Sequence, residues 1–427
     1  MHAIVRPGPQ SQQRRWWRLL GPGLIAGAAD DDPSGIATYA QAGTQFGFGL
    51  SWTLVLTWPL MVAIQAISAR IGRTTGLGLA GNMRRHYPRG LVGAVVGMLC
   101  VANVLNIGAD LGAMAESAHL LLPLWQWVYV VAFAALCLVC QLHFQHARYV
   151  AILKWLTLSL LAYFATLSVV HIQWRSLLSG LFWPRLTFDR EFWAVVVAIL
   201  GTTISPYLFF WQAAQEVEDT KSDPERQPLN EAPTQAASAL SRIRVDTLVG
   251  MAVSNLVALA ILVTAAATLH TGTVRQIESA AQAAEALRPL AGKFAFTLFA
   301  LGIISTGLIS VPVLAGSAAY ALGEARRWSV GLSHAPRRAK AFYGAIAVAT
   351  LLGALENAFG ISPLRALLWA AILNGIVAVP VMILVMLLAS DHRVMGRLKI
   401  SPRLKVAGWS ATAVMAAASV VFFLTLA

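Results

Sequence analysis

The sequence predicts an all-α membrane protein with eleven transmembrane helices, and three observations lead to this fold class. Of its 427 residues 57% are hydrophobic and 12% are charged, and the mean hydropathy is +0.65. Soluble proteins carry about twice that share of charged residues. Long apolar stretches recur along the whole chain, and basic residues gather in alternate joints between them. The solvent around most of the chain is therefore expected to be a lipid bilayer.

A helix needs about 20 mostly apolar residues to cross the hydrocarbon core of a bilayer. Eleven stretches meet this requirement, namely residues 20–46, 48–70, 91–120, 122–141, 147–171, 190–215, 245–270, 292–322, 338–356, 362–389 and 405–427. We expect residues 20–389 to form one transmembrane domain, and residues 390–427 to form a cytoplasmic joint followed by the eleventh helix. The polar stretch 219–244 is expected to be a cytoplasmic loop.

Residues 1–19 contain basic side chains but no short apolar core with a cleavage site, so we expect a retained cytoplasmic arm. Lys and Arg in short loops prefer the cytoplasmic side. With the N-terminus inside, 25 of the 32 basic residues fall on cytoplasmic segments and 7 on outer ones. The C-terminus is then expected on the outer side. We expect the protein to lie in the plasma (inner) membrane. This orientation explains the net charge of +13, so we expect no nucleic-acid partner.

Acidic residues interrupt the first apolar stretch. Asp30, Asp31 and Asp32 lie directly before Pro33 and close to Gly35. A charge at the bilayer centre costs about 2.5–3.5 kcal/mol on insertion scales, unless it faces water, a cation or protein. Pro33 lacks a backbone N–H and Gly35 tolerates irregular backbone, so the helix is expected to unwind here. Its freed carbonyl groups would then be available as ligands.

The sixth stretch holds a matching break, where Thr202 and Ser205 precede Pro206. Alone, this pattern is typical of a proline kink whose freed backbone groups bond to hydroxyls. Two breaks, each opening a block of five helices, instead indicate an inverted repeat with a substrate site between discontinuous helices. The repeats would cover about residues 20–171 and 190–389. Helix ends and a carboxylate would form a cation site at mid-membrane.

At the first break the chain resembles the Nramp (natural resistance-associated macrophage protein) family of divalent metal transporters. Family members carry Asp-Pro-Gly-Asn in the first helix. Asp32 and Pro33 match this motif, whereas Ser34 and Gly35 stand at the positions of Gly and Asn.

The sixth helix of family members carries Ala-x-x-Met-Pro-His. Here Thr202 replaces the Ala, Ser205 the Met and Tyr207 the His, while Pro206 is retained. The resemblance implies a LeuT-type 5+5 inverted repeat with discontinuous helices 1 and 6, and transport of a divalent metal by alternating access. The candidate metal ligands are Asp32, Gly35, Thr202 and Ser205, with Asp30, Asp31, Asp110, Tyr207 and Asn374 as secondary candidates.

The replacement of Met by Ser205 bears on which ion is carried. A thioether is a soft ligand that favours transition metals, whereas carboxylate, hydroxyl and carbonyl oxygens suit Mg²⁺ or Mn²⁺. The chain thus looks closer to the Nramp-related magnesium transporters than to the iron and manganese importers. The metal is the transported substrate. We expect no resident cofactor, and the sequence does not indicate a protein partner.

The proton machinery of the family is altered. Asp110 matches the acid of a family Asp-x-x-Glu pair, but Ala113 stands at the Glu position. Tyr207, at the His position, does not titrate near neutral pH, and the ninth stretch lacks the family's arginines. We therefore expect weak or absent proton coupling. A role in a proton relay and a structural role within the bundle fit Asp110 equally well. Asn374 could contact the cation or form a hydrogen bond between helices.

Two other function classes remain open. A LeuT-fold symporter of an amino acid or organic cation would share the broken helices, although three acids at one break favour a cation over a carboxylate. An intramembrane aspartyl protease would need two facing aspartates, and the run Gly108-Ala109-Asp110 lacks both the Gly-x-Gly-Asp pattern and a Tyr-Asp partner. No Walker loop indicates ATP-driven pumping. We expect a transporter and not an enzyme.

Overall fold

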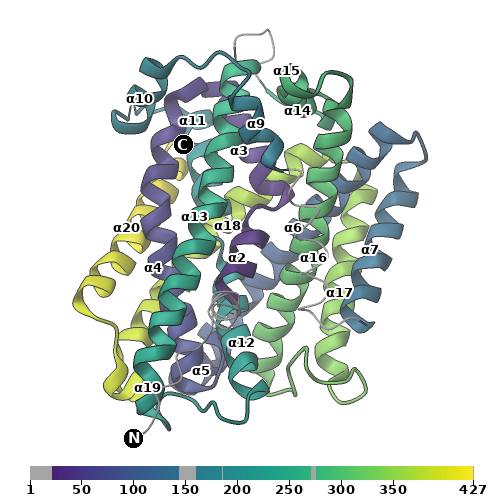
Figure 1. Cartoon of the computed structure of the whole chain (residues 1–427). Coiled ribbons are helices and arrows are strands. Elements are labelled where there is room, and N and C mark those ends of the chain that lie inside the picture. Colours follow the sequence, from purple (N-terminus) through teal and green to yellow (C-terminus); the bar gives the residue numbers. More distant parts are fainter. Residues whose placement is uncertain (1–21, 144–159, 185, 271–275, 427) are drawn as a thin grey trace, which may run out of the picture.

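The structure is a computed structural model that describes residues 22–143, 160–184, 186–270 and 276–426. This part of the chain is helical throughout and contains no strand. The expected cytoplasmic arm, residues 1–19, lies outside the described residues, as does most of the fifth expected span. The helices run side by side as a bundle with short helices at both ends (Figure 1).

Eight helical runs in the described ranges are long and apolar enough to cross a bilayer, which makes the chain a multi-pass membrane protein. The longest unbroken helices are α4 (Ser51–Thr75), α6 (Arg89–Leu121), α7 (Gln126–His143), α13 (Ala236–Thr268), α16 (Ala295–Arg326), α17 (Lys340–Glu356), α18 (Pro363–Ser390) and α20 (Pro402–Leu424). Of the fifth expected span, the structure describes α9 (Leu161–Leu167).

Two further spans are each built from a pair of helices. The first pair is α2 (Pro22–Asp30) and α3 (Pro33–Phe46), and the second is α11 (Arg190–Thr203) and α12 (Pro206–Ser222). The breaks fall where the sequence places Pro33 and Pro206. The expectation of discontinuous first and sixth spans is therefore confirmed.

Short helices connect the spans at the two ends of the bundle. They are α5 (Leu79–His86), α10 (Trp174–Phe182), α14 (Ala280–Ala284), α15 (Arg288–Ala291) and α19 (His392–Met395). Gly76 ends α4 because it adopts a left-handed conformation, with φ of 68°, and its N–H donates to the carbonyl of Gly72 at 3.0 Å.

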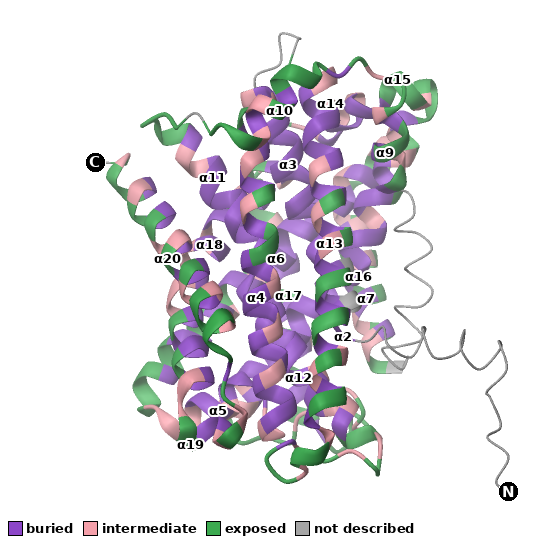
Figure 2. Cartoon of the chain, turned by 60° about the vertical axis from the view of Figure 1, so that its left-hand side comes forward, coloured by how far each residue is buried: buried purple, intermediate pink, exposed green. Residues whose placement is uncertain are grey.

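Buried side chains fill the centre of the bundle, and exposed ones lie on its outer surface and at its ends (Figure 2). Large apolar side chains remain exposed on outer helices, among them Val131, Leu351 and Val420. In a soluble protein such a surface would be unfavourable, but here it is the surface that meets lipid acyl chains.

The connection between α12 and α13 corrects one expectation. Residues 219–244 were expected to form a loop, but α12 continues to Ser222 and α13 begins at Ala236. Between them Leu229 is buried, and its N–H donates to the carbonyl of Arg73 at 3.2 Å. The expectation is wrong because polar helical turns extend beyond the apolar span, and the remaining joint folds against the end of α4.

Candidate metal site at the two helix breaks

The first break is a gap of two residues between α2 and α3, and Asp32 organises it. Its backbone is extended, and its Oδ1 atom accepts hydrogen bonds from the Gly35 N–H and the Ser34 hydroxyl, both at 2.7 Å. Asp32 thereby caps the N-terminus of α3, which favours a negative charge. Pro33 occupies the first helical position, where the missing N–H costs no hydrogen bond. Asp32 is only 2% exposed.

The second break lies between α11 and α12, and Ser205 closes it. The Ser205 hydroxyl lies 2.8 Å from the carbonyl oxygen of Gly201 and 2.7 Å from that of Thr202. It has one proton to donate and two lone pairs that accept. Since the proton points at these carbonyls, the lone pairs remain available on the other side of the oxygen.

Three contacts bring the two breaks together. The Thr202 and Ser34 hydroxyl oxygens are 3.3 Å apart. The Tyr207 hydroxyl donates to the carbonyl of Ala29 at 3.0 Å and lies 3.5 Å from Oδ2 of Asp32. The carboxylate, three hydroxyls and a freed carbonyl therefore lie in one small region.

Gly35 permits this close approach because it has no side chain. A Cβ atom at this position would lie 3.3 Å from both the Asp30 carbonyl oxygen and the Thr202 hydroxyl oxygen. That spacing is tighter than most real Cβ contacts, so any larger residue would push the breaks apart.

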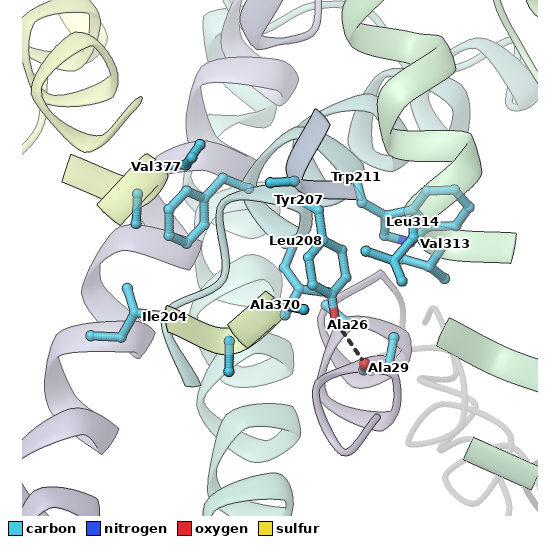
Figure 3. Close-up of a cluster of buried hydrophobic side chains, with 14 of the residues drawn as sticks. Ala26, Ala29, Ile204, Tyr207, Leu208, Trp211, Val313, Leu314, Ala370 and Val377 are labelled. Atoms are coloured by element: carbon cyan, nitrogen blue, oxygen red, sulfur yellow. Dashed lines mark hydrogen bonds between the residues drawn. The ribbon is translucent and has the colours of Figure 1, made fainter. Parts of the chain in front are cut away.

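Figure 3 shows how α12 is held against the end of α2. Tyr207 reaches Ala29, and its hydrogen bond closes the end of α2. Trp211 lies one turn further along α12, beside Val313 and Leu314 of α16. These side chains belong to the same buried apolar cluster, which packs around the breaks.

Asn106 of α6 is a site residue that the sequence reasoning missed. Its amide Nδ2 donates to Oδ2 of Asp32 at 3.2 Å, and its side chain is fully buried. Asn106 precedes Asp110 by four residues, so the two lie on the same face of α6. That spacing between polar residues in an apolar helix was the available signal.

The other acidic candidates, Asp30, Asp31 and Asp110, form hydrogen bonds with residues of other helices. Ser254 of α13 donates to Oδ2 of Asp30 at 2.6 Å and lies 3.1 Å from Oδ1 of Asp31. Asp110 accepts a hydrogen bond from Ser310 of α16 at 2.6 Å. Within the described residues, none of these three carboxylates bonds to Asp32, so the structure does not gather the four acids into one cluster.

Asn374 lies on α18, next to the second break. Its neighbour Gly375 packs closely on Gly201 of α11. A Cβ atom added at Gly201 would overlap the carbonyl oxygen of Ala371. Asn374 is fully buried, yet neither atom of its amide has a hydrogen-bond partner among the described residues. An unsatisfied buried amide costs about 1–3 kcal/mol and requires an explanation.

Charge in this region is unbalanced. In the part of the chain that the structure describes, none of Asp30, Asp31, Asp32 or Asp110 forms an ion pair. The same residues contain no group of three or more His, Cys, Asp or Glu side chains that could hold a metal. An ion at the breaks would therefore be bound by one carboxylate and by neutral oxygen atoms.

Comparison with known proteins agrees with this architecture. A family model described as natural resistance-associated macrophage protein-like matches residues 23–425. The chain belongs to the Nramp family. The match includes both helix breaks, so the resemblance noted in the sequence is confirmed at the level of the family.

Relatives within the Nramp family are transporters. The chain is 29% identical over 307 residues to the divalent metal cation transporter MntH of Aeromonas hydrophila. The matched region covers 69% of this chain and 70% of that protein. It is 26% identical over 408 residues to MntH of Burkholderia ambifaria, covering 93% and 86%. The expectation of a transporter rather than an enzyme is confirmed.

Solved structures share the fold at low sequence identity. The manganese transporter of Eremococcus coleocola superposes with a TM-score of 0.73 at 16% identity, over 99% of this chain and 89% of that chain. Mhp1, a nucleobase-cation-symport-1 family transporter, superposes with a TM-score of 0.58 at 16% identity, over 95% and 88%. The expected LeuT-type fold is thereby confirmed, while the count of eleven helices stays a prediction.

Proposed function

We propose that this chain carries Mg²⁺ or Mn²⁺ across a membrane by alternating access, with weak or absent coupling to protons. Its Nramp relatives are divalent metal cation transporters, and a solved structure of the same fold is a manganese transporter. The observation that carries the proposal is Asp32, a buried carboxylate between two broken helices without a basic partner in the described chain. A visiting divalent cation would supply the missing charge.

The donor atoms support a hard cation. Asp32 provides a carboxylate, and Ser34, Thr202 and Ser205 provide hydroxyls close to the freed carbonyls of the two breaks. Hard oxygen ligands suit Mg²⁺ and Mn²⁺, and Mg²⁺ keeps several of its waters when it binds. The proposal therefore places this chain near the magnesium branch of the family.

Two cavities support alternating access. A cavity of 130 Å³ at the expected outer end is lined by Ala37, Gln41 and Glu191 among others. Ala37 is five residues along α3 from Asp32, or about 7 Å of helix. A second cavity, of 460 Å³, lies at the other end between α5, α12 and α16 and includes Ala214. The breaks lie between the two, so opening either end would expose the site to that side.

The side chains at the family's proton positions favour weak coupling. Asp110 bonds to Ser310, and Tyr207 bonds to the Ala29 carbonyl. Glu116, almost one turn beyond the family's Glu position, accepts the N–H of Ala280 at 2.8 Å and so holds the start of α14. One oxygen of each carboxylate is held in a structural hydrogen bond, and Tyr207 does not titrate near neutral pH, whereas a relay needs titratable groups in succession.

The same proposal includes the topology. We propose that residues 20–171 and 190–389 form the two inverted repeats, each opened by one break. The positive-inside bias supports a cytoplasmic N-terminus and an outer C-terminus in the plasma or inner membrane.

Flux into proteoliposomes tests the proposal. Asp32→Asn removes the charge and keeps the shape, so we expect Mg²⁺ and Mn²⁺ uptake to fall to background while the protein remains folded. Glu225→Gln is the matched control, since it removes an exposed carboxylate in the joint after α12 and should leave uptake unchanged. Full uptake by Asp32→Asn would refute the proposal. Uptake of an amino acid or organic cation without metal uptake would favour the other symporter class.

A further inference from the structure

A groove of 880 Å³ lies on the lipid-facing surface between α4, α13 and α20. Both α13 and α20 pack on α4, which lies between them in Figures 1 and 2. Small side chains leave this space open, among them Ala63, Ala66 and Ala407. Pro59 lies inside α4 and removes one backbone hydrogen bond, which favours a local bend beside the groove. The volume is that of a small-molecule site.

Three arginines line one end of this groove, one from each helix. They are Arg70, Arg244 and Arg403. Arg70 is held in place because its Nη2 atom donates to the carbonyls of Leu398 and Lys399, both at 2.9 Å. Within the described residues none of the three arginines forms an ion pair with a carboxylate. The end of the groove therefore carries three positive charges that no carboxylate of the described residues pairs with.

The rest of the groove is apolar and about as long as one bilayer leaflet. Trp58 and Arg70 are twelve residues apart on α4, which corresponds to about 18 Å of helix. Half of the hydrocarbon core measures about 15 Å. Val62 lies between these positions on α4, and Ile243 and Leu248 of α13 also line the groove. An apolar channel of leaflet length with a cationic end has the shape and polarity of a phospholipid with an anionic headgroup.

We propose that this groove binds one anionic phospholipid from the leaflet on the basic side of the membrane. Its phosphate would lie among Arg70, Arg244 and Arg403, and an acyl chain would extend along α4 toward Trp58. Basic pockets between transmembrane helices on the cytoplasmic side bind anionic headgroups in this way. A zwitterionic lipid would fill the apolar channel, but its headgroup has no net charge and would not neutralise the positive charge of the three arginines.

Native mass spectrometry of the full chain tests the proposal by counting lipids retained after release from mild detergent. The probes are phosphatidylglycerol and phosphatidylcholine. The test variant carries Arg244→Gln and Arg403→Gln, because both side chains are exposed and Arg70 keeps its bonds to the segment before α20. The matched control carries Arg337→Gln and Arg338→Gln, two exposed arginines at the same end of the bundle but outside the groove.

The native chain is expected to retain one phosphatidylglycerol and to release it at high salt. A basic side chain near an anionic lipid surface contributes about fivefold to binding. The test variant should therefore bind phosphatidylglycerol about 25-fold more weakly, and the control variant should bind it like the native chain. Phosphatidylcholine should be retained weakly and equally by all three.

Several results would overturn the proposal. They are equal retention of phosphatidylglycerol by both double variants, equal retention of the two lipids by the native chain, or a dimer that excludes lipid. If the test variant does not fold, a photoreactive phosphatidylglycerol can be applied to the native chain. It should label the peptide that contains Leu240–Leu248, and labelling confined to other helices would reject the groove.

Discussion

The substitution Gly35→Ala tests whether the spacing between the two breaks controls metal binding, because it should affect metal affinity more than the stability of the fold. Gly35 lies inside α3, so alanine should stabilise that helix by about 0.5–1 kcal/mol. The new Cβ would lie 3.3 Å from the Asp30 carbonyl oxygen, the Thr202 hydroxyl oxygen and a ring carbon of Tyr39. Such crowding costs about 1–3 kcal/mol, and its contact with Thr202 is relieved by moving α11 away from α3. The net change in stability is thus expected to be a loss of about 0–2.5 kcal/mol.

The same displacement of a few tenths of an ångström should have a larger effect on transport. Mg²⁺ requires near-ideal geometry at about 2.0–2.1 Å from its ligands. If half of the crowding energy, about 0.5–1.5 kcal/mol, appears as lost binding, the apparent affinity for Mg²⁺ falls about two- to thirteenfold. Mg²⁺ and Mn²⁺ uptake into proteoliposomes, measured over a range of concentrations, reports this change, and thermal unfolding in detergent reports stability.

Gly344→Ala is the matched control for this experiment. Gly344 also lies inside a helix, α17, but a Cβ there would meet no atom within 4 Å. This variant should gain about 0.5–1 kcal/mol of stability and transport normally. The reasoning about Gly35 is refuted if Gly35→Ala is stabilised to the same extent and keeps the native affinity for both ions.

Three further predictions follow from individual side chains. Ser205→Met introduces a thioether at the second break and should make Cd²⁺ a stronger competitor of Mn²⁺ uptake; unchanged competition by Cd²⁺ would count against Ser205 as a ligand. Metal entry should cause little internal acidification in liposomes loaded with a pH-sensitive dye, and stoichiometric acidification would contradict weak coupling. Asn374→Leu should raise the unfolding temperature, because it removes a buried amide without partners in the described chain, and should lower metal uptake. A lower unfolding temperature would instead show that the amide bonds between helices.

The helix breaks could be predicted from the sequence because proline acts locally. Pro33 and Pro206 both occupy the first position of a new helix, where their fixed φ and missing N–H are tolerated. Apolar length likewise predicted most of the spans. The boundaries of α13 could not be predicted from hydropathy, because its first turns are polar and lie beyond the apolar stretch that begins at residue 245.

The partners of the acidic residues could not be predicted, since they depend on how helices distant in sequence pack. Asp30 and Asp31 face Ser254 of α13, whereas Asp32 faces Asn106 of α6. Where a helix unwinds, consecutive side chains no longer follow the helical period, so the sequence could not show which acid meets which neighbour. Asn106 was missed because its spacing from Asp110 shows a shared face of α6 but not that this face meets Asp32.

Crystallography with Mn²⁺, located by its anomalous scattering, tests whether a divalent cation binds to Asp32 between the two breaks. We expect a single strong peak between the two breaks, within about 2–2.5 Å of a carboxylate oxygen of Asp32, and loss of that peak in Asp32→Asn. A peak at Asp110 or beside Ser254, with Asp32 still bonded to Ser34 and Asn106 and no ion nearby, would contradict it.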